Sequence, residues 1–280
     1  MTDPHVQPPV LTEVTDRVGV VTLNRPEARN ALSSEVIRLL PQAMAALDDD
    51  SDVDVIILTG ADPAFCAGLD LKELGSTGRN LGAAPGGSSA PSSSPAATER
   101  PADRPTRRGP WGQLSKPVIG AINGVAITGG FELALSCDLL VASDRARFAD
   151  THARVGVMPG WGLTVLLPQA VGIRRAREMS LTGNFMAADE ALRVGLVNHV
   201  VDHDELLSFT RRLAADIVGN DQPGVRRILA TYTAVADGTL AEGWATEAAM
   251  GRSWLTDRDV TGGVAARREA IMARGRQQIE

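Results

Sequence analysis

The segment Lys116–Leu139, KPVIGAINGVAITGGFELALSCDL, constrains the fold more than any other part of the chain. Its apolar, β-branched run at 118–122 is typical of a buried strand. Glycines at 124, 129 and 130 interrupt that run before a helical pattern at Phe131–Cys137. A strand that ends at glycines and continues as a helix leaves main-chain N–H groups without partners. Because Glu132 stands in the first helical turn, the segment predicts amide donors beside a carboxylate, an arrangement suited to oxyanion stabilisation and proton transfer.

The rest of the chain predicts an α/β fold. Strand patterns at 18–23 and 53–58 flank a helical pattern that starts at Ser33 or Ser34, and further strands follow. Helical periodicity dominates from 163 onwards, and amphipathic helices are expected at 204–218 and from 240 to the end. We therefore predict a core at 1–200 and a C-terminal helical region at 201–280.

Residues 75–110 differ in composition from their surroundings. Ser, Pro, Ala and Gly dominate this stretch, as in GAAPGGSSAPSSSPAA, so it offers too little apolar surface to fold independently. We predict a flexible low-complexity insertion within the core, because long surface insertions cost little stability.

Composition and charge exclude several classes of function. The formal net charge of −6, without a basic cluster, argues against a nucleic-acid partner. No apolar run approaches membrane-spanning length, and the first ten residues lack the basic and apolar regions of a signal peptide. Cys66 and Cys137 form no CxxC pair, which fits a reduced compartment. We therefore expect a cytoplasmic protein without a membrane partner.

Common cofactor and metal signatures are missing from the sequence. No GxxxxGK[ST], GxSxG or HExxH pattern occurs, and Gly160-Trp161-Gly162 lacks the third glycine of a dinucleotide loop. His199 and His203 are four residues apart, but the pattern at 196–201 is that of a strand, so shared metal ligation is not expected. We predict no metal site.

Several motifs in sequence order resemble the crotonase superfamily, also called the enoyl-CoA hydratase/isomerase family. The motifs cover most of 18–201, and their order makes the resemblance specific. They are Leu23-Asn24-Arg25-Pro26 with Asn30-Ala31-Leu32, the run Phe65-Cys66-Ala67-Gly68-Leu69-Asp70-Leu71, the Lys116 segment, Val155-Gly156-Val157-Met158-Pro159-Gly160, and Leu181-Thr182-Gly183 with Gly195-Leu196-Val197.

The resemblance implies a crotonase-type spiral of ββα units with a C-terminal α-helical trimerisation region. It implies a homotrimer or a dimer of trimers, and an acyl-CoA thioester as substrate. Coenzyme A would enter as part of that substrate, so no separate cofactor is expected. The implied reaction is that of an enoyl-CoA hydratase, which adds water across the double bond of a 2-enoyl-CoA through an oxyanion-stabilised thioester enolate.

Residue roles follow from the same resemblance. The main-chain N–H groups of Leu69 and Gly129 would form the oxyanion hole, and a fixed donor of this kind is worth about 3–4 kcal/mol in the transition state. Glu132 matches the first of the two glutamates that hydratases of this family use as acid and base. The residues expected to contact substrate or coenzyme A are Ala67, Gly68, Asp70, Lys72, Arg29 and Trp161.

The sequence departs from the family pattern at two site positions. His152 stands where the second glutamate is expected, and Asp150, two residues away, is expected to point elsewhere. Histidine can exchange protons near neutral pH, so Glu132 and His152 are predicted as the catalytic pair. Thr128 replaces the small residue usual before Gly129, and we expect the fold to accommodate it.

His152 leaves other functions open. An isomerase, or a hydrolase or lyase of the same superfamily, would also suit this pair. A non-catalytic acyl-CoA-binding protein, with His152 as a structural histidine beside the pocket, is the alternative from another class.

Overall fold

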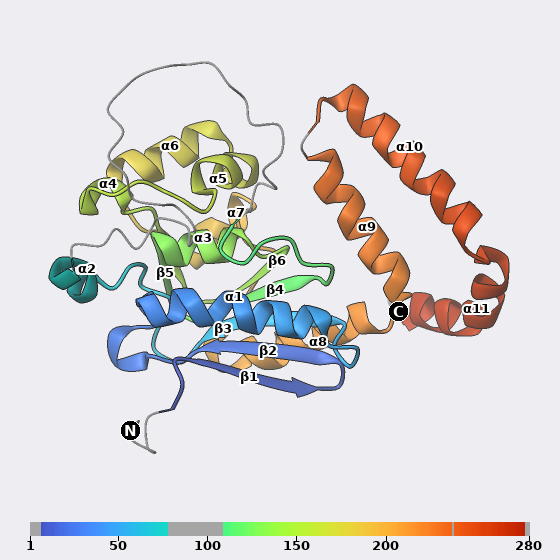
Figure 1. Ribbon diagram of the computed structural model, residues 1–280, viewed down its shortest axis with the longest axis horizontal. Helices are drawn as coiled ribbons and strands as arrows, with labels where there is room; N and C mark the ends of the chain where they lie inside the picture. Colours follow the sequence, from blue (N-terminus) through green and yellow to red (C-terminus); the bar gives the residue numbers. More distant parts are fainter. Residues whose placement is uncertain (1–6, 78–108, 237, 278–280) are drawn as a thin grey trace. The chain divides into compact units, whose positions relative to one another are not determined.

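The computed structural model describes residues 7–77, 109–236 and 238–277, and Figure 1 shows their arrangement. A six-stranded sheet has the order β1-β2-β3-β4-β6-β9, in which β1 pairs antiparallel with β2 and every other pair is parallel. Its strands are β1 (Val10–Thr15), β2 (Val18–Leu23), β3 (Val55–Gly60), β4 (Val118–Ile122), β6 (Leu139–Ser143) and β9 (His199–Val201).

A smaller sheet of three strands lies beside it, with the order β5-β7-β8. Strands β5 (Val125–Ile127) and β7 (Arg147–Ala149) are parallel, and β8 (Met186–Ala187) pairs antiparallel with β7. The chain runs from β4 in the large sheet to β5 in the small one and then into helix α3 (Gly129–Leu135). It repeats this path from β6 to β7 to helix α4 (His152–Val155), as a spiral of ββα turns predicts.

This repetition brings the beginnings of α3 and α4 together. Ile127 pairs with Ala149 at the ends of β5 and β7, and the Thr128 N–H donates to the Ala149 carbonyl at 3.0 Å. Because parallel strands end at the same edge of a sheet, the residues that follow them are neighbours. Glu132 in α3 and His152 in α4 both follow this edge.

The core lies on both faces of the large sheet, because successive side chains of a strand point to opposite faces. On β3, Ile56 and Leu58 belong to the cluster that includes Val36 and Leu40 of helix α1 (Ser34–Asp49). The remaining apolar residues of β3, Val55 and Ile57, pack with the cluster that includes Leu206 and Ala214 of helix α8 (Leu206–Val218). Helix α1 begins at its N-cap Ser33, whose hydroxyl accepts the Val36 N–H.

Helices α5 (Leu163–Val171), α6 (Ile173–Thr182) and α7 (Ala188–Arg193) confirm the helical periodicity expected after 163. The core unit also contains α2 (Leu71–Thr77) and the short 3₁₀ turns η1 (Pro26–Ala28) and η2 (His203–Glu205). The stretch 148–162 contains the end of β7 and the whole of α4. Both elements are too short to show a period in the sequence.

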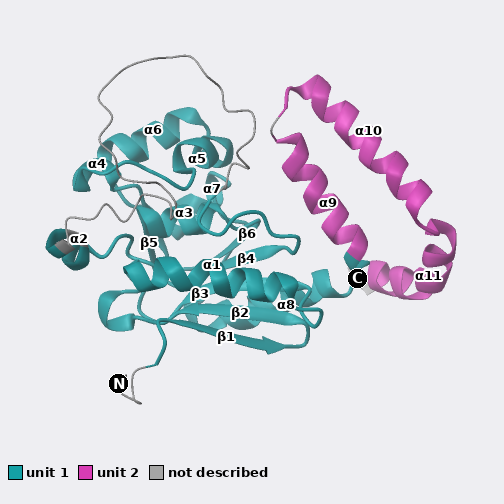
Figure 2. Cartoon of the chain, in the orientation of Figure 1, with its two compact units in different colours: residues 1–222 teal, residues 223–280 magenta. Residues whose placement is uncertain are grey.

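The chain divides into two compact units, residues 1–222 and 223–280, which Figure 2 colours separately. Helix α8 packs against one face of the large sheet and belongs to the first unit. The second unit consists of α9 (Gln222–Val235, which begins at the last residue of the first unit), α10 (Leu240–Asp257) and α11 (Val260–Gln277). A capping box between Thr239 and Glu242 starts α10.

Most of the predicted insertion at 75–110 lies outside the described residues; its first three residues complete α2. None of the helices that the structure describes combines the length and apolar character needed to cross a bilayer.

Candidate active site

Main-chain pairing brings the two glycine turns of the sequence motifs together. Cys66 pairs with Ala126 of β5 in a parallel bridge: its N–H donates to the Val125 carbonyl at 2.9 Å, and its carbonyl accepts the Ile127 N–H at 3.0 Å. Only glycine fits at position 130, because a Cβ there would lie 2.2 Å from the Cys66 carbonyl oxygen. The first turn of α3 therefore lies directly against the loop that carries Leu69.

The hydrogen bonds of the Leu32–Leu69 bridge do not use the Leu69 N–H, and those within α3 do not use the Gly129 N–H. In the bridge between Leu32 and Leu69, Leu32 bonds to the Gly68 carbonyl and to the Asp70 N–H, so the Leu69 N–H faces the other side of the loop. Gly129 is the first residue of α3, where an N–H has no partner within its helix. Both residues line one cavity.

That cavity joins four of the predicted site residues. The volume of this cavity that the centre of a water molecule can occupy is about 20 Å³, which is enough for about one water. The residues that line it are Leu69, Gly129, Glu132, His152, Val157, Met158, Gly160 and Trp161. The loop at 157–160 forms one wall; its sequence was noted only as a motif, because nothing in its pattern marks the side chains that face a cavity.

Backbone amides fix the Glu132 carboxylate. Its Oε1 accepts N–H groups from Gly160 at 3.1 Å, Trp161 at 2.7 Å and Leu163 at 3.4 Å. The side chain is only 4% exposed. With Oε1 held by this loop, Oε2 faces the His152 Nε2 at 3.5 Å. One oxygen therefore orients the group, and the other faces the histidine.

The histidine ring is held on its opposite side by Asp150. The Oδ1 of Asp150 lies 2.6 Å from the His152 Nδ1, and it also accepts the His152 backbone N–H at 3.1 Å. Asp150 therefore contacts the ring of His152 but does not line the cavity. The tight turn after β7 folds its carboxylate back onto the ring two residues later, and both side chains are buried. The sequence did not predict this contact between Asp150 and His152; its only signal was the Asp-x-His spacing.

The two carboxylates control the charge of the ring. Burial alone would lower the pKa of His152, but the hydrogen bonds and charges of Asp150 and Glu132 outweigh burial and raise that pKa to about 9. Burial also acts to raise the pKa of Asp150, yet its hydrogen bonds to His152 and Ser180 hold that pKa below the usual value. At neutral pH the site therefore contains an imidazolium between two carboxyl groups.

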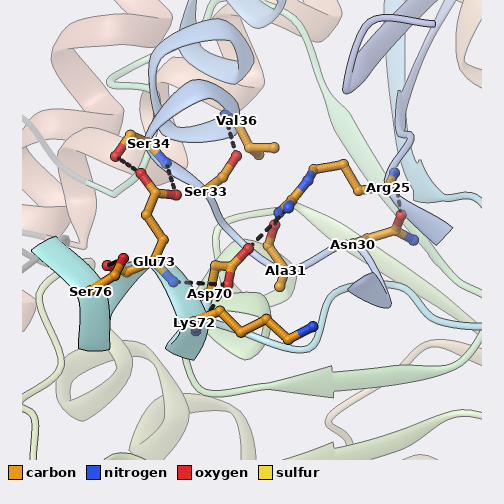
Figure 3. Close-up of polar contacts among 10 residues, drawn as sticks. All are labelled: Arg25, Asn30, Ala31, Ser33, Ser34, Val36, Asp70, Lys72, Glu73 and Ser76. Atoms are coloured by element: carbon orange, nitrogen blue, oxygen red, sulfur yellow. Dashed lines mark hydrogen bonds and ion pairs between the residues drawn. The ribbon is translucent and has the colours of Figure 1, made fainter. Parts of the chain in front are cut away.

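Asp70 lies at the centre of a group of local hydrogen bonds. As Figure 3 shows, its carboxylate accepts the Arg25 guanidinium at 2.9 Å and the N–H groups of Lys72 and Glu73 at 3.1 and 3.3 Å. Arg25 also donates to the Ala31 carbonyl at 2.7 Å. Asp70 thus bonds to the first turn of α2 and links it, through Arg25, to the loop before α1. These contacts hold the neighbouring residue, Leu69, in place.

The other predicted binding residues surround this loop. Arg29 and Lys72 are exposed, and the Arg29 carbonyl accepts the Ala67 N–H at 3.0 Å. Gly68 has a φ of +83° and supplies the turn before Leu69. Neither Ala67 nor Gly68 lines the cavity, whereas Trp161 does.

Thr128 is accommodated outside the cavity. Its hydroxyl hydrogen-bonds with that of Thr151, the residue before His152, although its φ of +53° is unusual for a β-branched side chain. Thr128 therefore links the beginning of α3 to the beginning of α4. Among the residues that the structure describes, no group of three or more His, Cys, Asp and Glu side chains could hold a metal ion.

Comparison with known proteins shows the family to which the chain is similar. The family model for enoyl-CoA hydratase/isomerase matches residues 13–91 and 111–273. A probable peroxisomal enoyl-CoA hydratase of Arabidopsis thaliana is 42% identical over 75% of this chain and 73% of its own length. A probable enoyl-CoA hydratase of Mycobacterium bovis is 36% identical over 92% of this chain and 93% of its own.

A solved structure agrees as well. The crystal structure of an enoyl-CoA hydratase from Mycobacterium smegmatis is 49% identical, covers 90% of this chain and all of that chain, and superimposes with a TM-score of 0.70. The predicted fold class is confirmed.

Proposed function

Because the chain belongs to the enoyl-CoA hydratase/isomerase family, we propose that it adds water across the double bond of a 2-enoyl-CoA thioester. The observation that carries this proposal is the cavity in which Glu132 and His152 meet beside Leu69 and Gly129. It contains a potential base, a potential acid and two directed amides, which together are the requirements of hydration.

The two amides would bind the thioester carbonyl oxygen. When a nucleophile adds to the β-carbon, negative charge moves onto that oxygen, and preorganised N–H donors stabilise it. Leu69 and Gly129 come from different loops, and the Cys66 bridge and the glycine at 130 hold these loops in contact. The oxyanion hole is therefore built by the fold and not by either loop alone.

Glu132 and His152 would divide the proton transfers. Glu132 Oε2 takes a proton from water while the water oxygen bonds to the β-carbon, and the imidazolium Nε2–H then gives its proton to the α-carbon of the enolate. Water has now been added, with Glu132 protonated and His152 neutral. Transfer of the proton from Oε2 to Nε2, across their 3.5 Å separation, restores the starting state.

Arg29 and Lys72 are proposed to meet the phosphates of coenzyme A. Both are exposed cations beside the loop that carries Leu69. Trp161 and Met158 line the cavity and are proposed to contact the acyl group. Met158 is 82% exposed, so substrate binding would cover an apolar side chain that otherwise contacts water.

The test is hydration of crotonyl-CoA, followed by loss of enone absorbance. We expect turnover by the wild-type protein and a loss of about 10²–10⁴-fold in kcat for Glu132→Gln, since this is the usual contribution of one acid–base group. Glu178→Gln, in an exposed surface pair with Arg175, is the matched control and should retain activity.

Other outcomes would redirect the proposal. Migration of the double bond without addition of water would identify an isomerase, which the same two groups could support by moving a proton between carbons. Tight acyl-CoA binding with no turnover on 2-enoyl-CoAs of any chain length would exclude hydration and identify a binding protein.

We also propose that the chain assembles as a trimer or a dimer of trimers. Helices α9 and α10 carry large apolar side chains that are more than half exposed, among them Tyr232 at 75%, Leu240 at 83% and Trp244 at 68%. Exposed apolar surface of this kind marks protein contacts. Light scattering should give three or six times the chain mass, and a monomer at micromolar concentration would contradict this proposal.

The proposed chemistry uses no metal or other cofactor, and the cytoplasm is its proposed location. Hydration polarises the thioester through main-chain amides, so dialysis against a chelator should leave turnover unchanged. Cys66 and Cys137 are both free thiols, which suits a reducing compartment. Cell fractionation would test the location.

A further inference from the structure

A second carboxylate controls the proposed acid. Asp150 is buried, with 2% of its side chain exposed, and it does not line the cavity. It contacts the ring of His152 from the side opposite to Glu132. A group in this position cannot touch substrate, so any influence on catalysis must pass through the histidine.

We propose that Asp150 is a positioning residue of the reaction, which holds the His152 ring doubly protonated with Nε2–H directed toward Glu132 and the cavity. This inference rests on the proposed function, since it explains why His152 is the acid and Glu132 the base. Nothing in the residue types alone decides that division, because histidine and glutamate can each perform either role.

The hydrogen-bond geometry fixes which ring nitrogen carries which proton. A carboxylate can only accept, so the 2.6 Å contact requires a hydrogen on Nδ1. The same Oδ1 accepts the His152 backbone N–H at 3.1 Å, which ties the carboxylate to the residue that it orients. After Nε2 has given its proton away, the neutral ring therefore keeps the Nδ1–H tautomer, with the Nε2 lone pair facing Glu132.

The charges around the ring support this role. Glu132 approaches from α3 and Asp150 from the turn after β7, and α6 contributes the Ser180 hydroxyl, which also bonds to Asp150. The nearby cation on α4, Arg154, points away and donates to the Thr182 carbonyl at 3.1–3.2 Å. The imidazolium is thus surrounded by acceptors, and the carboxylate that faces away from the cavity is the one that substrate does not disturb.

The first test measures the ring itself. In the full-length protein with labelled histidine, NMR titration should show His152 titrating near pH 9, with both ring nitrogens protonated at pH 7.5. His152→Gln assigns its signals. A neutral His152 ring at pH 7.5 would overturn the proposal without any Asp150 variant, so the test stands even if such a variant fails to fold.

Asp150→Asn then removes the charge but keeps the shape and an acceptor oxygen. We expect the pKa of His152 to fall by about 1–3 units, the usual effect of a single neighbouring opposite charge. Asp62→Asn is the matched control, because Asp62 contacts a different histidine, His203, at 3.1 Å. This control should leave the His152 titration unchanged.

Kinetics separate positioning from a merely structural role. In the wild-type enzyme, kcat/KM should decline as pH rises through about 9, where the acid loses its proton. In Asp150→Asn this basic limb should move to lower pH by the same amount as the NMR titration, so the loss of activity relative to wild type should increase as pH rises.

Equal loss of activity at every pH, with an unchanged His152 titration, would show that Asp150 is only structural and would overturn the inference. Failure of the wild-type protein to hydrate any 2-enoyl-CoA would instead overturn the proposed function. The NMR result decides between these two failures, because it requires no substrate.

Discussion

Two histidine–aspartate pairs lie among the described residues of the first unit, and the histidine of the first pair, His152, lines the cavity. His152 contacts Asp150 at 2.6 Å, and 2% of the Asp150 side chain is exposed. His203 contacts Asp62 at 3.1 Å, and 64% of the Asp62 side chain is exposed. Both pairs combine the same residue types, so their surroundings must account for any difference in what they do.

The second pair even continues into a serine. The His203 Nδ1 lies 3.3 Å from the Ser143 hydroxyl, which gives the order Asp–His–Ser of many nucleophilic sites. However, Ser143 is fully buried, and its hydroxyl donates to the Asn123 carbonyl and accepts the Arg145 N–H. This set of residues stabilises the fold. The comparison teaches that residue types alone do not distinguish the two pairs; the first differs in that His152 lines a cavity together with Leu69 and Gly129.

The largest difference in kcat between variants of the two pairs is expected when each histidine is replaced. His152→Gln should lower kcat for crotonyl-CoA by about 10²–10⁴-fold, because it removes the proposed acid. His203→Gln should stay within about twofold of wild type, since its ring contacts only structural groups. Stopped absorbance assays at neutral pH measure both, and comparable losses in the two variants would contradict the distinction drawn here.

Two glycine substitutions test whether close packing of the loops around the cavity is needed for stability and catalysis. In Gly130→Ala the new Cβ would lie 2.2 Å from the Cys66 carbonyl oxygen, so the two loops must separate, at a cost of about 1–3 kcal/mol in unfolding free energy. Catalysis should fall as well, because the Leu69 and Gly129 amides move apart.

Gly251→Ala is the matched control. This glycine is also helical, in α10, but a Cβ there meets nothing within 4 Å. The substitution should raise the unfolding free energy by up to about 1 kcal/mol. Urea denaturation measures both variants. Equal stability of Gly130→Ala and wild type would show that the loops are not held as closely as described.

The pH dependence of stability should also distinguish the pairs. The folded-state pKa of His152 is raised to about 9 from its usual 6.5, so its stabilising contribution is complete below pH 6.5 and is lost as pH rises through about 9. The pKa of Asp150 is lowered from 3.8, so its contribution is present above that pH and is lost on acidification.

Thermal denaturation between pH 6.5 and 9 tests this expectation. The melting temperature of the wild-type protein should fall across that range, and His152→Gln should lack this part of the decline. Parallel curves for the two proteins would mean that the charge of His152 does not stabilise the fold.

The smallest effect is expected at the exposed pair. Asp62→Asn should change the unfolding free energy by less than about 1 kcal/mol, because an exposed ion pair contributes little in water. Urea denaturation in low and moderate salt measures it, and a loss of several kcal/mol would show that this pair is more than a surface contact.

Much of the fold could be read from local pattern. The apolar run at 118–122 became β4, and the helical periods at 163–170 and 174–181 became α5 and α6 within a residue or two. These elements have periods long enough to recognise. By contrast, β7 and α4 have three and four residues, and no period can reveal them.

Only part of the candidate site could be predicted from the sequence. Glu132 and the glycine turns follow from strand, turn and helix chemistry, and the motif order pointed to His152 as its partner. The contact of Asp150 with His152 could not be predicted, because the direction of the Asp150 side chain depends on the backbone of a single tight turn. The packing of α8 could not be predicted for a similar reason: its ordinary amphipathic pattern does not say whether its apolar face meets the large sheet or other helices.

The amino-acid order alone specified the strands, the glycine turns and the residue types that carry chemistry, because these depend on neighbours within a few positions along the chain. The tertiary structure decided which of two His–Asp pairs became a site. It set the parallel register of β5 and β7, which places Glu132 beside His152, and it formed the bridge from Cys66 to Ala126, which brings two distant amides to one cavity. Such contacts join residues far apart in sequence, and only the packing of the whole sheet determines their distances.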